Sequence, residues 1–432
     1  MVVRVHPSDK ETTLASNSLD RFAIFGGKPA FETPLHVGCP NIGDRKRLYE
    51  RLDSILDRRV LTNNGPMVRE FEERVADIVG VRHCIAMCNG TVALEIVTRA
   101  LGMKEEAIVP SLTFVATAHA LQWQQISPVF CDVKPGSHHM DPAQIHNLLT
   151  PRTSGILPVN LWGRPCDIDA ILAVAEQNRL PVVFDSAHMF ACSYKGSMIG
   201  SFGDAEVFSF HATKFMNTFE GGAVVTNDDE LAATVRLMQN FGFSGRDLVT
   251  HVGINGKMTE VAAAMGLTSL DAMDRFVERN RENYHAYRLK LRPVPGVEIV
   301  EYDERERCNF QYIVIDVDEN ITGIGCDELM AVLAAENVDA RRYFSPGCHR
   351  MEPYSSYFPN AGLLLRNTED SLSRVLTLPT GTAVEARDAE KIGELIQRIV
   401  ADGAAIHARL QSRPGRESRP QTGRLARCVN YR

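Results

Sequence analysis

Short apolar runs alternate with helical patterns between residues 84 and 226 of this chain of 432 residues. Seven runs have the length of strands, at residues 84–87, 107–109, 129–133, 155–159, 182–184, 206–210 and 222–226. After the first run, Leu94, Val97 and Leu101 recur at the spacing of one helix face. Such alternation predicts an α/β fold with a mostly parallel seven-stranded sheet and helices on both faces. Functional residues are then expected at the carboxyl ends of the strands.

The composition divides the chain into four parts. Two amphipathic helices are predicted between residues 45 and 80, on either side of a loop at 61–66. A long charged helix over 271–291 leads into a smaller α+β region. The last residues are rich in arginine and hold too few apolar side chains to fold. The predicted parts are a flexible N-terminal arm (1–20), a large domain (21–270), a small C-terminal domain (271–408) and a disordered basic tail (409–432).

The charge balance excludes some classes of protein. The formal net charge is −7, which argues against a body that binds nucleic acid. No apolar run approaches the length of a membrane span, and residues 1–20 lack the apolar stretch of a signal peptide. We therefore expect a cytoplasmic protein with no nucleic-acid or membrane partner.

Two residues near predicted strand ends indicate a cofactor. Asp185 closes the apolar run 182–184, and Lys214 follows the strand at 206–210. A lysine amine can bond to the aldehyde of pyridoxal 5′-phosphate (PLP), and a carboxylate can keep the pyridine nitrogen of PLP protonated. Either residue alone is more often a solvated lysine or a capping aspartate. Together they predict a PLP enzyme in which Lys214 and Asp185 are catalytic.

A phosphate group has a candidate site at the start of a predicted helix. Gly90 and Thr91 lie between a strand and a helix, where free backbone N–H groups and the positive end of the helix dipole suit an anion. Ser209 lies five residues before Lys214 and is placed to donate to the same phosphate. Such turns also occur as simple helix caps, and Ser209 has local backbone as an alternative partner. The order of these residues relative to Lys214 favours the phosphate.

Two ring-bearing residues complete the predicted cofactor site. Phe114 follows a strand end and is placed to stack on the pyridine ring, with core packing as the alternative. His188 lies three residues after Asp185 and is placed to bond the ring hydroxyl, with a core role as its alternative. The sequence lacks the motifs of two other kinds of enzyme. It has neither the His-x-x-x-His motif of a zinc site nor the Gly-x-Ser-x-Gly motif of a serine hydrolase.

Several stretches resemble the nucleotide-sugar aminotransferases of the DegT/DnrJ/EryC1/StrS family. They are NGT (89–91), VPSLTFVAT (109–117), LWGRP (161–165), FSFHATK (208–214), FEGGAVVT (219–226) and GINGKM (253–258). The resemblance covers about residues 22 to 405. It implies fold type I of the PLP enzymes, PLP with pyridoxamine 5′-phosphate as its second form, and L-glutamate as amino donor. It also implies a homodimer with active sites at the subunit interface.

The resemblance carries roles onto individual positions. Lys214 matches the lysine that bonds PLP, Asp185 the partner of the ring nitrogen, and Phe114 the stacking aromatic. The phosphate positions are matched by Gly90, Thr91 and Ser209.

Asn255 matches an asparagine that reaches the phosphate from the other subunit. The family commonly has glutamine where this chain has His188, and often arginine where it has Lys257.

Within the family, three further stretches are similar to the 4-aminotransferases of desosamine biosynthesis: LYERLD (48–53), AAAMGLTSLD (262–271) and YFSPGCH (343–349). This similarity implies that TDP-4-keto-6-deoxyglucose is converted by ping-pong transamination to TDP-4-amino-4,6-dideoxyglucose, for the deoxyaminosugar of a secondary metabolite such as an antibiotic. Alternatives are a 3-aminotransferase, or a 4-aminotransferase for a more deoxygenated sugar. Less favoured are a sugar dehydratase, in which histidine replaces the lysine, and a non-catalytic regulator. Candidate substrate contacts are Thr62, Asn63, Asn309 and Gln311, with hydrogen bonds that stabilise a loop as the alternative role of each.

Overall fold

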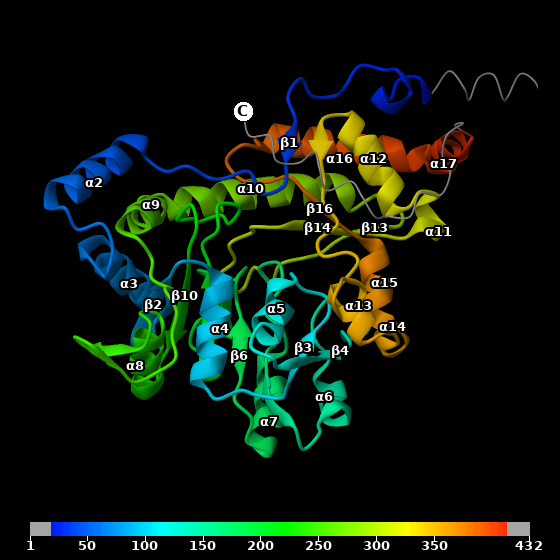
Figure 1. Cartoon of the computed structure of the whole chain (residues 1–432). Coiled ribbons are helices and arrows are strands. Elements are labelled where there is room, and N and C mark those ends of the chain that lie inside the picture. Colours follow the sequence, from blue (N-terminus) through cyan, green and yellow to red (C-terminus); the bar gives the residue numbers. More distant parts are fainter. Residues whose placement is uncertain (1–18, 413–432) are drawn as a thin grey trace, which may run out of the picture.

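Seven strands form the central sheet of the large domain in this computed structural model, which describes residues 19–412 (Figure 1). Their spatial order is β2 (His83–Met87), β10 (Gly222–Thr226), β9 (Ala205–Ser209), β6 (Val183–Asp185), β5 (Thr153–Ile156), β3 (Glu106–Pro110) and β4 (Ser127–Cys131). Single parallel bridges, including Val159 to Asp185, join β5 to β6. Only β10 runs antiparallel to its neighbours in this sheet. The predicted mostly parallel sheet and all seven of its strands are confirmed.

Helices cover both faces of the sheet because successive strand residues point to opposite sides. One apolar core contains side chains of α4 (Gly90–Ala100), α5 (Ala116–Gln122) and α8 (Asp229–Met238). The other contains side chains of α3 (Pro66–Val79), α6 (Pro142–Leu148), α7 (Ile168–Asn178) and α9 (Glu260–Asp271). On β6, Val183 lies in the first core and Phe184 in the second, so alternation turns Asp185 to the face that carries α4.

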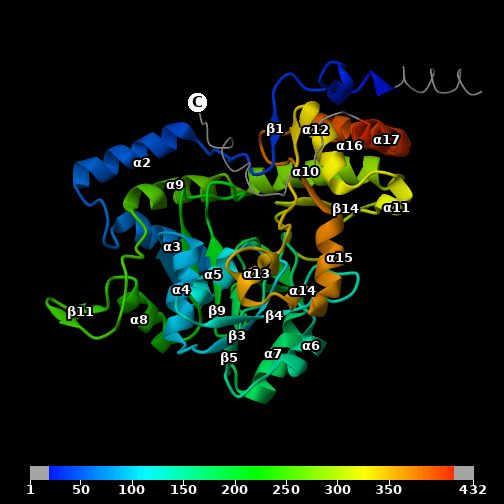
Figure 2. The same ribbon diagram turned by 45° about the vertical axis from the view of Figure 1, so that its right-hand side comes forward.

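The small domain lies above the large sheet in Figures 1 and 2. Its three antiparallel strands follow the order β13 (Val297–Ile299), β14 (Ile313–Val317) and β16 (Val375–Leu378). They share an apolar core with α10 (Met273–Leu291), α12 (Cys326–Ala335) and α16 (Ala386–Ala401). The charged helix predicted over 271–291 corresponds to α10. No helix within residues 19–412 is long and apolar enough to cross a membrane.

The start of the described chain packs on the small domain, which the sequence did not indicate. Leu19, Phe22 and Phe31 are buried in the core of the small domain. Strand β1 (Leu35–His36) pairs in parallel with β15 (Val338–Asp339). The sequence had placed residues 21–40 with the large domain, because apolar residues near a chain end do not reveal which core they enter. At the other end, α17 runs over Gly403–Gln411, so residues 409–411 of the predicted tail are helical. Residues 1–18 and 413–432 of the predicted arm and tail lie outside the described residues.

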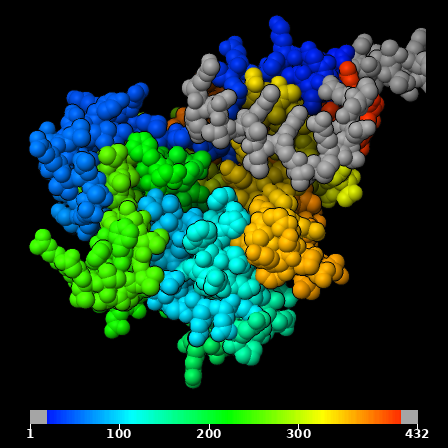
Figure 3. All heavy atoms as spheres, viewed as in Figure 1, coloured from blue at the N-terminus to red at the C-terminus, as the bar shows by residue number. Residues whose placement is uncertain are grey.

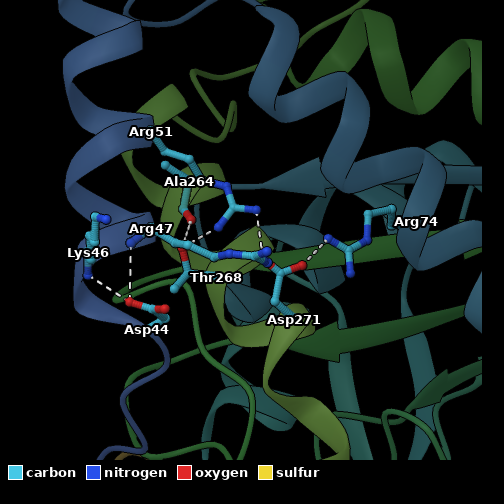
Figure 4. A network of polar contacts seen from close by, with 8 residues as sticks. All are labelled: Asp44, Lys46, Arg47, Arg51, Arg74, Ala264, Thr268 and Asp271. Atoms are coloured by element: carbon cyan, nitrogen blue, oxygen red, sulfur yellow. Dashed lines mark hydrogen bonds and ion pairs between the residues drawn. The ribbon is translucent and has the colours of Figure 1, made fainter.

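Helix α2 (Arg45–Arg58) lies at the edge of the molecule and is attached by both apolar and polar contacts. Ile55 is its buried residue. The carboxylate of Asp271 receives hydrogen bonds from Arg51 and Arg74 at 2.8 Å each and from Arg47 at 3.2 Å (Figure 4). This network joins α2 and α3 to the end of α9. Two large apolar side chains of α2, Tyr49 and Leu56, are exposed to solvent.

Helix α3 receives its N-terminal cap from a distant residue. Gly65, at the cap position, offers no side chain, but the Glu260 carboxylate accepts hydrogen bonds from the backbone N–H groups of Met67 at 3.0 Å and Val68 at 2.9 Å. Glu260 is fully buried, and a Cβ at Gly65 would lie 2.5 Å from its carboxyl carbon. The carboxylate therefore satisfies two helix N–H groups and meets the positive end of the helix dipole.

We expect Glu260→Ala to lower the free energy of unfolding by roughly 3 kcal/mol, because two buried N–H groups lose their acceptor. The exposed Glu73 of the same helix provides the control, and Glu73→Ala should change stability by less than about 0.5 kcal/mol. Urea unfolding followed by circular dichroism measures both. Equal unfolding midpoints for the two variants would contradict the capping role.

Candidate active site

A cavity of about 280 Å³ opens at the carboxyl ends of the central strands. Its walls come from the start of α4, the loop after β3, the ends of β6 and β9, and three small-domain residues, Tyr312, Tyr343 and Phe344. The cavity lining contains all the predicted cofactor residues except Asn255, namely Gly90, Thr91, Phe114, Asp185, His188, Ser209 and Lys214. The residues that the sequence placed near strand ends therefore lie together in one cavity, and their roles toward a cofactor stay predictions.

Lys214 extends into this cavity from the turn after β9. Its backbone N–H donates to the His211 carbonyl at 2.9 Å, and its Nζ donates to the Tyr312 hydroxyl at 3.3 Å. Burial lowers the pKa of the amine to about 8, against the opposing effect of the Asp185 charge. A substantial fraction of this amine is therefore neutral at mildly basic pH, which is the form that attacks an aldehyde or accepts a proton.

Asp185 ends strand β6 as a buried carboxylate. Thr117 donates its hydroxyl to Oδ2 at 2.8 Å, and the Ala187 N–H donates to Oδ1 at 3.2 Å. Burial raises the pKa of Asp185, while these hydrogen bonds and the Lys214 charge oppose the rise. A buried carboxylate is costly unless a cation lies beside it, so this position suits a protonated ring nitrogen.

The start of α4, with the ends of β9 and β10 beside it, is the candidate anion site. The Asn89 side chain caps α4 by accepting from the Val92 N–H at 2.8 Å, while the first N–H groups of a helix have no partner within it. Ser209 lies beside Gly90, since a Cβ added at Gly90 would be 3.3 Å from the Ser209 Cβ. A Cβ at Gly222 would be 2.6 Å from the Gly90 nitrogen, so only glycine allows β10 to pass this close.

His188 is held as a neutral donor at the cavity wall. Its Nδ1 accepts a hydrogen bond from the backbone N–H of Trp162 at 3.2 Å, so the proton of the neutral ring is on Nε2. Burial and the nearby Lys214 charge hold the pKa of His188 well below its ordinary value. The ring stacks on Phe344 at 5.9 Å with planes 8° apart. A neutral Nε2–H is the form that can donate to a phenolic oxygen.

Comparison with known proteins assigns the chain to a family. Residues 43–397 match the model of the DegT/DnrJ/EryC1/StrS aminotransferase family. The chain belongs to this family. It is 36% identical over 370 residues to the dTDP-4-amino-4,6-dideoxy-D-glucose transaminase of Shigella dysenteriae, covering 85% of this chain and all of that protein.

Solved structures of family members have the same fold. DesI, determined in the presence of its TDP-sugar product, is 48% identical with a TM-score of 0.86, covering 91% of this chain and all of that one. DesV of S. venezuelae, in complex with a ketimine intermediate, is 28% identical with a TM-score of 0.77, covering 82% of this chain and 95% of that one. These likenesses confirm a fold of PLP aminotransferases for this family member.

The sequence did not reveal three residues that are far along the chain from the ones they contact in this site. Thr117 is fully buried and bonds Asp185 across 68 positions of the chain. Tyr312, which bonds Lys214, and Phe344, which stacks on His188, come from the small domain. No local pattern identifies such residues, although Thr117 and Phe344 lie inside two of the stretches that resemble the family.

The four candidate substrate residues do not line the cavity that the predicted cofactor residues share. Asn309 is fully buried, and its side-chain amide donates to the carbonyls of His188 at 2.9 Å and Phe190 at 3.2 Å. Asn309 therefore holds the loop after β6, as in the alternative role considered for it, and its contact with the sugar stays a prediction. Gln311 is buried outside the cavity lining.

Three other predicted residues lie on the surface. Thr62, Asn63 and Asn255 are exposed and do not line the cavity of their own chain. Asn255 forms an antiparallel bridge with Asn240. Substrate contacts by Thr62 and Asn63, and a phosphate contact by Asn255, remain predictions that need a second subunit or a ligand.

The amine of Lys214 should react with an acylating reagent with a midpoint near pH 8 in PLP-free protein, because burial favours its neutral form. Lys195 is the internal control. It is exposed, and its hydrogen bond from Nζ to Asp169 raises its pKa, so it should react only at higher pH. Mass spectrometry of labelled peptides across pH measures both residues, and identical profiles would contradict the shifted pKa of Lys214.

Proposed function

We propose that this chain is a PLP-dependent aminotransferase that moves the amino group of L-glutamate to C4 of TDP-4-keto-6-deoxyglucose. The product is TDP-4-amino-4,6-dideoxyglucose, used in deoxyaminosugar biosynthesis in the cytoplasm. One observation carries the reaction type: a lysine amine, a buried carboxylate and a helix N-terminus share one cavity. The substrate is supported by the names of two relatives, the S. dysenteriae transaminase and DesI with its TDP-sugar product.

The residues of the cavity fit PLP by their chemistry. Lys214 would bond the aldehyde, Asp185 would hold the ring-nitrogen proton, and the start of α4 with Ser209 would bind the phosphate. His188 would donate Nε2–H to the ring hydroxyl, and Phe114 would cover the ring. When bound, PLP supplies an electron sink for the carbanion and, as pyridoxamine 5′-phosphate, carries the amino group between the two half-reactions.

The chain itself supplies the proton transfers. Lys214 has a pKa near 8, so its neutral amine is available to remove the α-proton of the donor. The same residue, once protonated, returns a proton to C4 of the sugar. Thr117 holds the carboxylate of Asp185 in place during both transfers. Tyr312 accepts a hydrogen bond from Lys214 and thereby directs the amine.

A homodimer is supported by exposed apolar side chains around the segment that carries Asn255. Exposed members include Tyr49 and Leu56 of α2, Phe243 of β11 (Phe243–Gly245), Val249 of β12 (Leu248–Val249) and Val252. Helix α2 and the β11–β12 hairpin project from the same side of the molecule in Figures 1 and 3. Large apolar side chains exposed on one side of a molecule suit an interface with a partner. A second copy would cover it and bring Asn255 to the partner's phosphate.

Purified protein incubated with PLP, L-glutamate and TDP-4-keto-6-deoxyglucose should give a sugar with an amine at C4, identified by mass and NMR. Lys214→Ala should give no product, because the proton-transferring amine is removed, while near-ultraviolet circular dichroism shows an unchanged fold. Turnover by Lys214→Ala would contradict the mechanism. An amine at C3, or turnover only of a more deoxygenated keto sugar, would replace the substrate assignment.

Mixing two inactive variants tests the shared site. Lys214→Ala and Asn255→Ala homodimers should each have little activity, but a heterodimer has one cavity with both native residues if Asn255 acts across the interface. We expect activity to appear after the two variants are unfolded and refolded together. Activity that stays at the sum of the separate variants would place Asn255 outside the partner's site.

A further inference from the structure

We propose that Asn41 is a positioning residue for Lys214, fixing the turn that carries the lysine and tying it to the small domain. Asn41 lies in the connecting segment, residues 37–43, between β1 and α2. It does not line the cavity and is therefore not a catalytic residue. The inference rests on the proposed function in that Lys214 is taken as the residue that captures PLP.

Asn41 is bonded to the lysine turn on its carboxyl side. Its side chain is 2% exposed, and its Nδ2 donates to the carbonyl of Phe215, the residue directly after Lys214, at 2.9 Å. The Asn217 side chain donates in return to the Asn41 carbonyl at 2.9 Å. Two buried hydrogen bonds thus fix the backbone within three residues of the reacting amine.

The other end of the Asn41 side chain is held by the small domain. The backbone N–H and the hydroxyl of Thr382 both donate to Asn41 Oδ1, at 2.8 Å each. Thr382 follows strand β16, so one side-chain amide joins a small-domain turn to the lysine turn. The Nδ2 donor, the Oδ1 acceptor and the main-chain carbonyl of Asn41 each bond another part of the chain.

The connecting segment also contacts the residue before Lys214. A Cβ at Gly38 would lie 3.0 Å from the Thr213 Cβ, and Gly38 has a φ of +78°. A larger residue would therefore push on Thr213 and strain the backbone. The segment consequently touches the lysine turn on both sides of Lys214.

The position of the amine depends on this support because its own side-chain contacts are few. Its hydrogen bond to Tyr312 is long, at 3.3 Å. A displacement of the turn would move Nζ relative to Asp185 and expose more of the half-buried lysine to water. Since burial is what lowers the pKa of Lys214, such a displacement should raise that pKa towards the ordinary lysine value.

Two variants of Asn41 and one matched control separate positioning from general stability. Asn41→Ala removes the bonds to both elements. Asn41→Asp keeps an acceptor for Thr382 but sets a carboxylate oxygen against the Phe215 carbonyl. Asn283 is the control, since it is fully buried and donates to the Val384 carbonyl at 3.0 Å and to Thr380 and Gly381 at 3.3 Å. Asn283→Ala therefore disturbs the same small-domain turn without touching the lysine turn.

Both Asn41 variants should weaken PLP binding about tenfold, the factor that corresponds to about 1.4 kcal/mol, in absorbance titrations of PLP-free protein. The labelling midpoint of Lys214 should rise by about one pH unit. Asn283→Ala should lower the melting temperature while PLP affinity and the labelling midpoint stay at the wild-type values.

Equal effects of Asn41→Ala and Asn283→Ala on PLP affinity and on the Lys214 midpoint would overturn the positioning role. An unchanged midpoint in Asn41→Asp would overturn it as well, and this variant decides the matter if Asn41→Ala does not fold. If wild-type protein captures no PLP, the proposed function fails instead. The labelling midpoints, measured without PLP, still decide whether Asn41 positions the amine.

Discussion

The buried carboxylate of Asp185 is the group around which the rest of the site is organised. Removing a carboxylate from water costs several kcal/mol unless a cation compensates it, and the same burial disfavours the charged form of Lys214. The negative charge of Asp185 and the positive charge of Lys214 therefore stabilise each other. Among the described residues, the hydrogen-bond donors to this carboxylate are the neutral Thr117 hydroxyl and Ala187 N–H, so the carboxylate suits a ligand that brings its own protonated ring nitrogen.

Two domains form the walls of this cavity, and a third part of the chain supports it from outside. The central sheet delivers Asp185, Ser209 and the turn of Lys214 from strand ends, and the small domain delivers Tyr312 and Phe344. The connecting segment supports the lysine turn through the hydrogen bond from Asn41 to the Phe215 carbonyl. Because the walls come from two domains, the width of the cavity depends on how these domains are seated against each other. The hydrogen bonds of Asn41 to Thr382 and to Phe215 cross that boundary directly.

Sequence reasoning succeeded where the signal is local. Each buried strand is a short apolar run, so all seven strands and the residues at their ends could be predicted, including Lys214 and Asp185. It failed where a partner is distant. Glu260 caps a helix that begins nearly two hundred positions earlier, and nothing near it indicates this role. The sequence also left open whether Asn309 contacts the sugar or holds a loop, because the carbonyls that accept from its amide lie about 120 positions away. Burial decides such cases, and burial of a polar residue cannot be read from its neighbours in sequence.

Because β1 pairs with β15, the small domain cannot complete its fold until late in synthesis. Leu35 is paired with Val338, about three hundred residues later. At a translation rate of roughly 5–20 residues per second, the N-terminal segment waits for tens of seconds before its partner strand leaves the ribosome. Leu19, Phe22 and Phe31 are apolar and stay without their core for that whole interval. During synthesis, residues 19–36 therefore expose apolar side chains to which chaperones can bind, and the large domain can fold well before this segment packs against the small domain.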